Sequence, residues 1–246
     1  MGSRDFTADL HIHTVLSPCA QRDMLPHCIV LEALEKGIDI IAVTDHNACE
    51  NVLLTIHLGE RFGIWVIPGI EVETKEEVHL LAYFPSYEDL LHFNQLVEAF
   101  LPPFPLDEAV WGEEWIIDEE GNIAAKKSNL LALPLSLSLE EVVEEVRRCQ
   151  GIPVLAHIDR RAYSVFSQLG FIPPGLAVEV LEVSPRASPD EVQKRFSLSG
   201  YRFLSSSDAH TLSEIGRRRT LFRMASCSWD EFLLALSGDR GRDIVV

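Results

Sequence analysis

The stretch Phe6-Thr7-Ala8-Asp9-Leu10-His11-Ile12-His13 decides the fold, because a short apolar run ends there in two histidines. A barrel buries its strands and exposes functional side chains at one end of them. Because the same type of junction recurs along the chain, the pattern predicts a metal-dependent hydrolase built on a barrel. The other junctions are Thr44-Asp45-His46, Ile70-Glu71, Val78-His79, Ala156-His157 and Asp208-Ala209-His210.

The order of the segments predicts an α/β fold in one domain, residues 1–246. Strand-like runs alternate with amphipathic stretches, which is typical of a βα repeat. We expect one helix to end at Gly37 and another, N-capped by Asn47, to run through Leu58. The strand-like runs cover residues 6–13, 40–46, 64–73, 78–84, 152–158, 177–183 and 203–208.

Residues 101–136 interrupt this alternation. They contain four prolines together with Trp111 and Trp115. The stretch 116–123 predicts a β-hairpin with its turn near Gly121. Two interpretations stay open for the segment, which is either a surface insertion or a lid or substrate wall over the mouth of the barrel.

Composition limits the partners and the compartment. Hydrophobic residues make up 47% of the chain, but no apolar run approaches the roughly 18 residues that a membrane helix needs. The five scattered cysteines predict reduced thiols and a cytoplasmic location. The net charge of −17 disfavours binding to long nucleic acid. A small phosphorylated substrate is compatible with it, because bound cations add local positive charge.

Two histidine-containing pairs lie near the two ends of the chain. Residues i and i+2 of a strand point to the same side, so His11 and His13 can reach one metal ion. Asp208 and His210 repeat this spacing, and a barrel places its first and last strands side by side. We therefore expect the two pairs to converge, with Asp9 close to the first.

Glu71, His79 and His157 each allow two interpretations. A glutamate after a strand is usually a surface residue, but its two oxygens can also bridge two cations. A histidine in an apolar run is usually a hydrogen-bonded core residue. Because each of these residues follows or lies within a strand-like run, we interpret all three as metal ligands, with Glu71 as the bridge.

Taken together, the motifs resemble those of the PHP (polymerase and histidinol phosphatase) family of metal-dependent phosphoesterases. They follow the family's order and span almost the whole chain. The resemblance implies a distorted (β/α)7 barrel that binds two or three divalent ions. The matching motifs are Asp9-Leu10-His11-Ile12-His13-Thr14, Thr44-Asp45-His46-Asn47, Pro68-Gly69-Ile70-Glu71, His79-Leu80-Leu81, Ala156-His157 and Ser207-Asp208-Ala209-His210.

The resemblance also implies three sets of metal ligands. The first set is His11, His13, Glu71 and Asp208. Glu71 bridges to a second ion, which His79 and His157 also hold, and His46 and His210 face a third. Relatives often have a histidine or aspartate in the third set where this chain has Cys19. A thiolate favours zinc or iron over manganese or magnesium, so the occupancy of the third site depends on Cys19.

The implied chemistry is hydrolysis of a small phosphomonoester. Two cations about 3.5–4 Å apart lower the pKa of a shared water, and the resulting hydroxide attacks phosphorus. Either the ion at His46 and His210 or one of these histidines itself would assist the leaving group. Asp9 and Asp45 are candidates for orienting the ligands. Arginine donates two parallel hydrogen bonds to phosphate, and the candidates for this role are Arg160, Arg186 and Arg217.

Several alternative functions stay open. Nuclease or nucleotide phosphatase activity would use the same ligands on mono- or oligonucleotides, and a C–N hydrolase shares the same metal logic. A non-catalytic metal-binding or scaffold protein belongs to a different class. The near-complete ligand set favours an enzyme over this last alternative.

Overall fold

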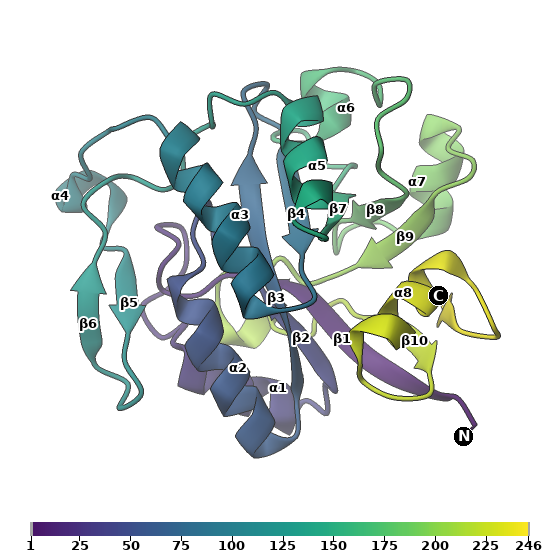
Figure 1. Cartoon of the computed structure of the whole chain (residues 1–246), viewed down its shortest axis with the longest axis horizontal. Helices are drawn as coiled ribbons and strands as arrows, with labels where there is room; N and C mark the ends of the chain where they lie inside the picture. Colours follow the sequence, from purple (N-terminus) through teal and green to yellow (C-terminus); the bar gives the residue numbers. More distant parts are fainter. Residues whose placement is uncertain (1, 246) are drawn as a thin grey trace.

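The computed structural model describes residues 2–245 and contains a nine-stranded sheet curved into a barrel (Figure 1). The strand order is β11-β10-β1-β2-β3-β4-β7-β8-β9. The predicted runs correspond to β1 (Arg4–Ile12), β2 (Ile40–Val43), β3 (Trp65–Glu73), β4 (His79–Tyr83), β7 (Ile152–Leu155), β8 (Val180–Val183) and β9 (Arg202–Ser205). The predicted distorted barrel is therefore confirmed, and β10 (Thr220–Met224) and β11 (Asp243–Val245) extend it beyond β1.

The distortion lies at β4, which runs antiparallel to both β3 and β7. Only a few residues separate β3 from β4, too few for the helical crossover that a parallel pair needs. The other neighbours among the predicted strands are parallel. The barrel closes where Ile12 forms a parallel bridge with Ala209. There the His13 N–H donates to the Ala209 carbonyl at 2.9 Å.

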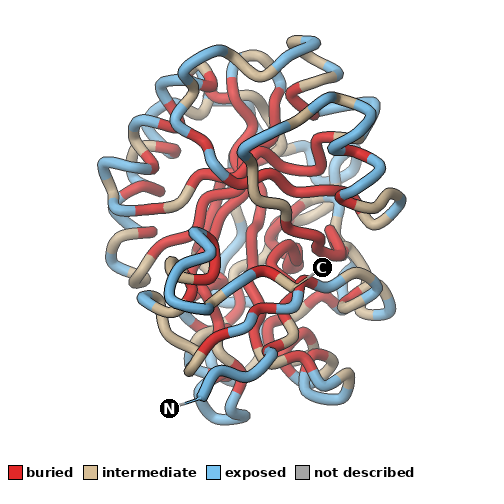
Figure 2. Tube along the Cα trace, turned by 90° about the vertical axis from the view of Figure 1, so that its right-hand side faces the viewer, coloured by how far each residue is buried: buried red, intermediate tan, exposed pale blue. Residues whose placement is uncertain are grey.

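Helices cover the outside of the barrel (Figure 1). Ile29 of α1 belongs to the same buried cluster as Ile12 and Ile41 of the sheet, and Phe232 of α8 meets Trp65 edge-on at the start of β3. Figure 2 shows the buried trace gathered at the centre of the molecule. The helices are α1 (Pro26–Glu35), α2 (Glu50–Phe62), α3 (Tyr87–Phe100), α4 (Glu108–Trp111), α5 (Leu139–Arg148), α6 (Val165–Gln168), α7 (Pro189–Phe196) and α8 (Trp229–Ser237), with the 3-10 helix η1 (Leu212–Glu214). None of those in the described chain is long and apolar enough to span a membrane.

The insertion forms the predicted hairpin of β5 (Trp115–Ile117) and β6 (Ile123–Lys126). Gly121, in the turn, has a φ of 85°, which glycine adopts without strain. The hairpin stands beside α2 and the loop that follows β1 (Figure 1). The Trp115 N–H donates to the Val15 carbonyl of that loop. The insertion is thus attached to the barrel beside the loop that carries Cys19.

The predicted N-cap at Asn47 is wrong. Helix α2 is capped at Cys49, and no side-chain hydrogen bond caps it. The Asn47 amide instead donates to the carbonyls of Leu131 and Leu133, at 2.8 and 2.9 Å. A left-handed backbone, with φ at 48°, turns Asn47 toward the insertion. A tertiary contact has therefore replaced the local cap that the sequence suggested.

Candidate metal centre

An irregularity in β1 aims its two histidines at the centre of the barrel mouth. The pairing of β1 with β2 shifts register between Asp9 and Ile12. Leu10 packs in the interior cluster, whereas Ile12 packs outward under α1. The shift reverses the alternation of side chains, as β-bulges do near functional sites. His11 and His13 consequently lie together, both fully buried.

The other predicted ligands reach the same place from the ends of their strands. His46 follows β2, and its backbone forms a parallel β-bridge with Glu71 of β3. His79 begins β4 opposite Glu73, because the antiparallel direction of β4 brings its first residue to this end of the barrel. His157 follows β7, and Asp208 and His210 follow β9. Side chains from separate strands are thereby assembled into one cluster.

The first group that could hold a metal ion consists of His11, His13 and Asp208. The Nε2 atoms of the two histidines are 3.2 Å apart. Asp208 Oδ1 lies 3.5 Å from His11 Nε2 and 3.6 Å from His13 Nε2. Glu71 Oε2 is 3.3 Å from both nitrogens. Ligand atoms around a tetrahedral zinc ion are separated by about 3.3–3.5 Å, given zinc–nitrogen distances near 2.0–2.1 Å.

The tautomers of these two histidines can be deduced from their outer contacts. His11 Nδ1 lies 3.0 Å from the Glu182 carboxylate, which accepts its proton. His13 Nδ1 lies 3.1 Å from Ser17 Oγ. The single Ser17 hydroxyl proton goes to Asp45, at 2.6 Å, so His13 must be the donor to Ser17. With the Nδ1 protons placed in this way, a neutral imidazole has a bare Nε2, and the two Nε2 atoms converge. Two bare nitrogens would repel each other, so the space between them favours a metal ion or a proton.

The second group consists of His46, Glu71 and His79. His46 Nδ1 is 3.2 Å from Glu71 Oε2, and His79 Nδ1 is 2.9 Å from Glu71 Oε1. His157 Nε2 is also 3.2 Å from Oε1. The Glu71 carboxylate thus faces different imidazoles with its two oxygens. It is almost completely buried, so water does not compete for them.

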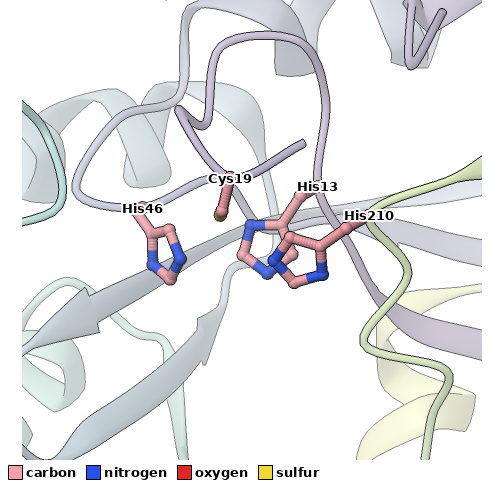
Figure 3. A group of neighbouring side chains, drawn as sticks. All are labelled: His13, Cys19, His46 and His210. Atoms are coloured by element: carbon pink, nitrogen blue, oxygen red, sulfur yellow. The ribbon is translucent and has the colours of Figure 1, made fainter. Parts of the chain in front are cut away.

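The third group, shown in Figure 3, is His13, Cys19, His46 and His210. Cys19 is exposed as a residue, but its sulfur points toward the histidines (Figure 3). Burial of the thiol, followed by the charge of Glu71, raises the pKa of Cys19. The His210 Nδ1–H donates to the Asp208 carbonyl at 3.0 Å and leaves Nε2 bare. The cluster opens to solvent on this side, where the His210 side chain is 27% exposed.

The electrostatic balance of the cluster favours a bound cation. Burial opposes ionisation of Glu71 and Asp208, but the neighbouring imidazoles hold the pKa of each carboxyl below its ordinary value. Burial lowers the pKa of His13, but contacts with Asp208 and Glu71 outweigh it and raise that pKa to about 9. Burial lowers the pKa of His210 to about 4. The carboxylates are therefore ionised at neutral pH, which provides the negative charge that divalent ions need.

Asp9 and Asp45 contact backbone and hydroxyl groups around the cluster. The Asp9 carboxylate accepts from the Ser207 and Gly216 N–H groups, at 2.9 and 2.7 Å. It thereby fixes the segment that carries Asp208. Asp45 accepts from Thr14 and Ser17 and reaches His13 only through the Ser17 hydroxyl.

Of the three predicted phosphate-binding arginines, Arg160 touches the cluster. Its Nη1 donates to Asp208 Oδ2 at 2.6 Å, and its side chain is 41% exposed. Arg217 donates to the carbonyl of Ser207, the residue that precedes Asp208 in the chain. It also donates to the Glu214 carboxylate. Arg186 is exposed in the segment after β8, whose Ser184 is hydrogen-bonded to Asp159. The structure thus brings Arg160 to the cluster and leaves Arg186 without a contact to it among the described residues.

Glu182 contacts two of the candidate ligands, and the sequence did not predict this role. It is almost completely buried in β8 and binds both the His11 ring and the His157 N–H, the latter at 3.0 Å. The available signal was one charged residue in the apolar run Val180-Leu181-Glu182-Val183. A buried carboxylate is rare unless it has a partner, so this position could have been flagged.

The family of the chain follows from sequence and structure together. Residues 9–160 match the family described as PHP domain, and residues 193–240 match the one described as PHP-associated. The chain belongs to the PHP family of metal-dependent phosphoesterases, as its motifs predicted. The uncharacterized protein YqxK of Bacillus subtilis is 24% identical to this chain, over 97% of this chain and 63% of its own length.

Two further similar proteins have named activities. The lesion-specific endonuclease EndoQ of Pyrococcus furiosus has a similar fold, with a TM-score of 0.74 and 21% identity over 99% of this chain and 58% of its own. The phosphoribosyl 1,2-cyclic phosphate 1,2-diphosphodiesterase of Eggerthella lenta is 32% identical, over 30% of this chain and 29% of its own. This chain thus spans less than two thirds of each of these relatives and of YqxK.

Proposed function

We propose that this protein hydrolyses a small phosphomonoester with the help of two or three divalent metal ions. The two-sided environment of Glu71 carries the proposal. Its Oε2 faces His11, His13 and His46, and its Oε1 faces His79 and His157. A carboxylate in this position suits a bridge between two cations, as in two-metal phosphatases.

The ligand residues of the cluster can be divided among three metal ions. His11, His13, Asp208 and Glu71 would hold one ion, and Glu71, His79 and His157 a second. A third would lie among His46, His210 and Cys19, and the thiol would favour zinc or iron over manganese there. When bound, such ions activate water and neutralise charge on phosphoryl oxygens.

The protein's own residues would orient the substrate. Arg160 is partly exposed and already donates to a carboxylate, so its guanidinium can donate to phosphoryl oxygens in the same way. The bare Nε2 of His210 and its low pKa favour a ligand role over proton donation at neutral pH. The ion held by His46, His210 and Cys19 would then assist the leaving group.

A metal-restoration assay tests this function. Purified protein supplied with zinc, iron or manganese is expected to release phosphate from a panel of phosphomonoesters. Glu71→Ala should lose one bound ion and nearly all activity. The proposal fails if the wild type turns over none of the esters with any metal. A Glu71→Ala variant that retains as many ions as the wild type would refute the bridge.

A second candidate is a nuclease acting on mono- or oligonucleotides. The fold similarity to EndoQ over 99% of this chain favours it, as do Arg160 and Arg217 on loops at the barrel mouth. The net charge of −17 argues against a long polymer. Cleavage of labelled oligonucleotides over a range of salt concentrations would distinguish the two. Binding that weakens steeply with salt would indicate contacts to several phosphates.

A further inference from the structure

The turn that follows β7 contacts the cluster on two sides. Arg160 reaches Asp208, and three residues later the Tyr163 carbonyl accepts the His79 N–H at 2.8 Å. The turn is fixed internally, because the Ser164 hydroxyl donates to the Arg160 carbonyl at 2.8 Å. The positions of Arg160 and Tyr163 are therefore set by the same short segment.

The ring of Tyr163 stacks on His79. The two ring centroids are 4.7 Å apart, and the planes differ by 21°. Tyr163 is nevertheless 41% exposed. One part of the ring covers a candidate metal ligand, and the rest offers an aromatic surface to solvent beside the cluster.

The backbone of Tyr163 is strained. Its φ is 58°, in the left-handed region that suits glycine or asparagine and is unfavourable for an aromatic residue. Local stability thus disfavours tyrosine at this position. The ring is better explained by what it contacts than by the conformation of the turn.

Tyr163 also differs chemically from the other partly exposed groups around the cluster. Cys19, His210 and Arg160 present a thiol, an imidazole and a guanidinium. These groups suit ions and phosphate. The Tyr163 ring presents a flat, largely apolar surface, which suits the organic part of an ester.

We propose that Tyr163 stacks on a planar ring in the alcohol part of the substrate, so that the site prefers nucleotides to simple sugar phosphates. This inference rests on the proposed phosphoesterase function and names the substrate class for it. Stacking of a base on an aromatic side chain is sequence-tolerant, and its loss would weaken recognition about 10- to 100-fold.

The test compares thymidine 5′-monophosphate with 2-deoxyribose 5-phosphate, in which a hydroxyl group replaces the base. Tyr163→Gly removes the ring and suits the positive φ, so it should fold. We expect its kcat/KM to fall about 10- to 100-fold on the nucleotide and to stay within about 3-fold on the sugar phosphate. Tyr163→Phe keeps the ring and should behave like the wild type. Phe62→Ala removes an equally exposed ring, 41%, at the far end of α2 and should change neither.

Metal content and nucleotide binding complete the test. Equal losses on both esters, together with fewer bound ions, would mean that Tyr163 only positions His79 and would overturn the proposal. No change on either ester would overturn it too. If the wild type hydrolyses neither these two esters nor any other ester of the phosphomonoester panel, the proposed phosphomonoesterase function fails separately. Equilibrium dialysis of the metal-loaded protein then decides: a preference for the nucleotide that Tyr163→Gly abolishes supports stacking, and equal binding refutes it.

Discussion

Glu182 shows how a single buried residue organises the centre. Its carboxylate binds the outer nitrogen of His11 and the backbone N–H of His157. A carboxylate at that nitrogen fixes the tautomer of the imidazole and increases its basicity as a ligand. Two candidate ligands on separate strands, β1 and the end of β7, are thereby oriented by one side chain from β8.

We predict that Glu182→Gln weakens metal binding about 10- to 100-fold, because the amide orients His11 without increasing its basicity. The measurement is a zinc titration of metal-free protein with a competing chelator. Glu179→Gln, at an exposed position in the segment before β8, is the matched control and should bind like the wild type. An unchanged zinc affinity in Glu182→Gln would mean that the negative charge of Glu182 does not affect metal binding by His11.

The sequence reveals residue types but not all of their partners. His11, His13 and Glu71 stand out because metal-binding residues directly end apolar runs. Glu182 has no such neighbour, and its role depends on β8 lying next to β7. Ser17 is equally hidden, since only the folded loop brings its hydroxyl between His13 and Asp45. Contacts that depend on tertiary packing leave little trace in local patterns.

At the scale of elements, the insertion is bound to the loops that carry ligands. The Asn51 amide in α2 donates to the Trp115 carbonyl and to Thr14, and its oxygen accepts from the Ile117 N–H. Thr14 in turn donates to Asp45. These contacts favour a fixed wall over a mobile lid. They connect the hairpin, through α2, to the loop after β1.

Asn51→Ala should therefore destabilise the protein by about 1–3 kcal/mol, because it leaves the buried groups of Trp115 and Ile117 without partners. Urea unfolding measures this loss. Hydrogen exchange should also accelerate in the loop after β1. Asn129→Ala, at an exposed position of the same insertion, should have no comparable effect. Equal stability of both variants would contradict the anchoring role of Asn51.

Glu114, within the insertion, predicts a dependence of stability on pH. It is fully buried, one oxygen accepts from the Leu131 N–H, and the other has no partner in the described structure. Burial raises its pKa from 4.5 to about 7. The folded state therefore binds a proton that the unfolded state releases, so this group's stabilisation declines as pH rises from about 4.5 to 7.

Glu114→Gln keeps the shape and removes the buried charge. We expect the variant to match the wild type at pH 4 and to exceed its stability by about 3 kcal/mol at pH 8. Urea unfolding of both proteins at each pH gives this difference. The other titratable groups are the same in both proteins, so their contributions cancel in the difference. A constant difference across pH would mean that Glu114 does not titrate in this range.

At the scale of the whole molecule, the barrel closes between the end of β1 and the segment that follows β9. The predicted strands and their order followed from apolar runs, and the antiparallel β4 could have been expected from its short connection to β3. β10 was missed although Thr220, Phe222 and Met224 are buried in alternation, and β11 is too short to give a pattern. The single-domain assignment stays a prediction. Closure itself rests on few contacts, the Ile12–Ala209 bridge and the Asp9 carboxylate among them.

Metal ions in this centre would join β1, β3 and the segment after β9, so they should stabilise the closed barrel as a whole. Free metal at 100 times its dissociation constant adds about 2.7 kcal/mol, which for a chain of this size raises Tm by about 5–10 °C. We predict that removing metal with a chelator lowers Tm by this amount and that zinc or manganese restores it. Glu71→Ala should lose most of the response, whereas Glu60→Ala, at an exposed position of α2, should retain it. An equal response in Glu71→Ala would show that the stabilising ions bind elsewhere, because the bridging carboxylate would then contribute nothing to their affinity.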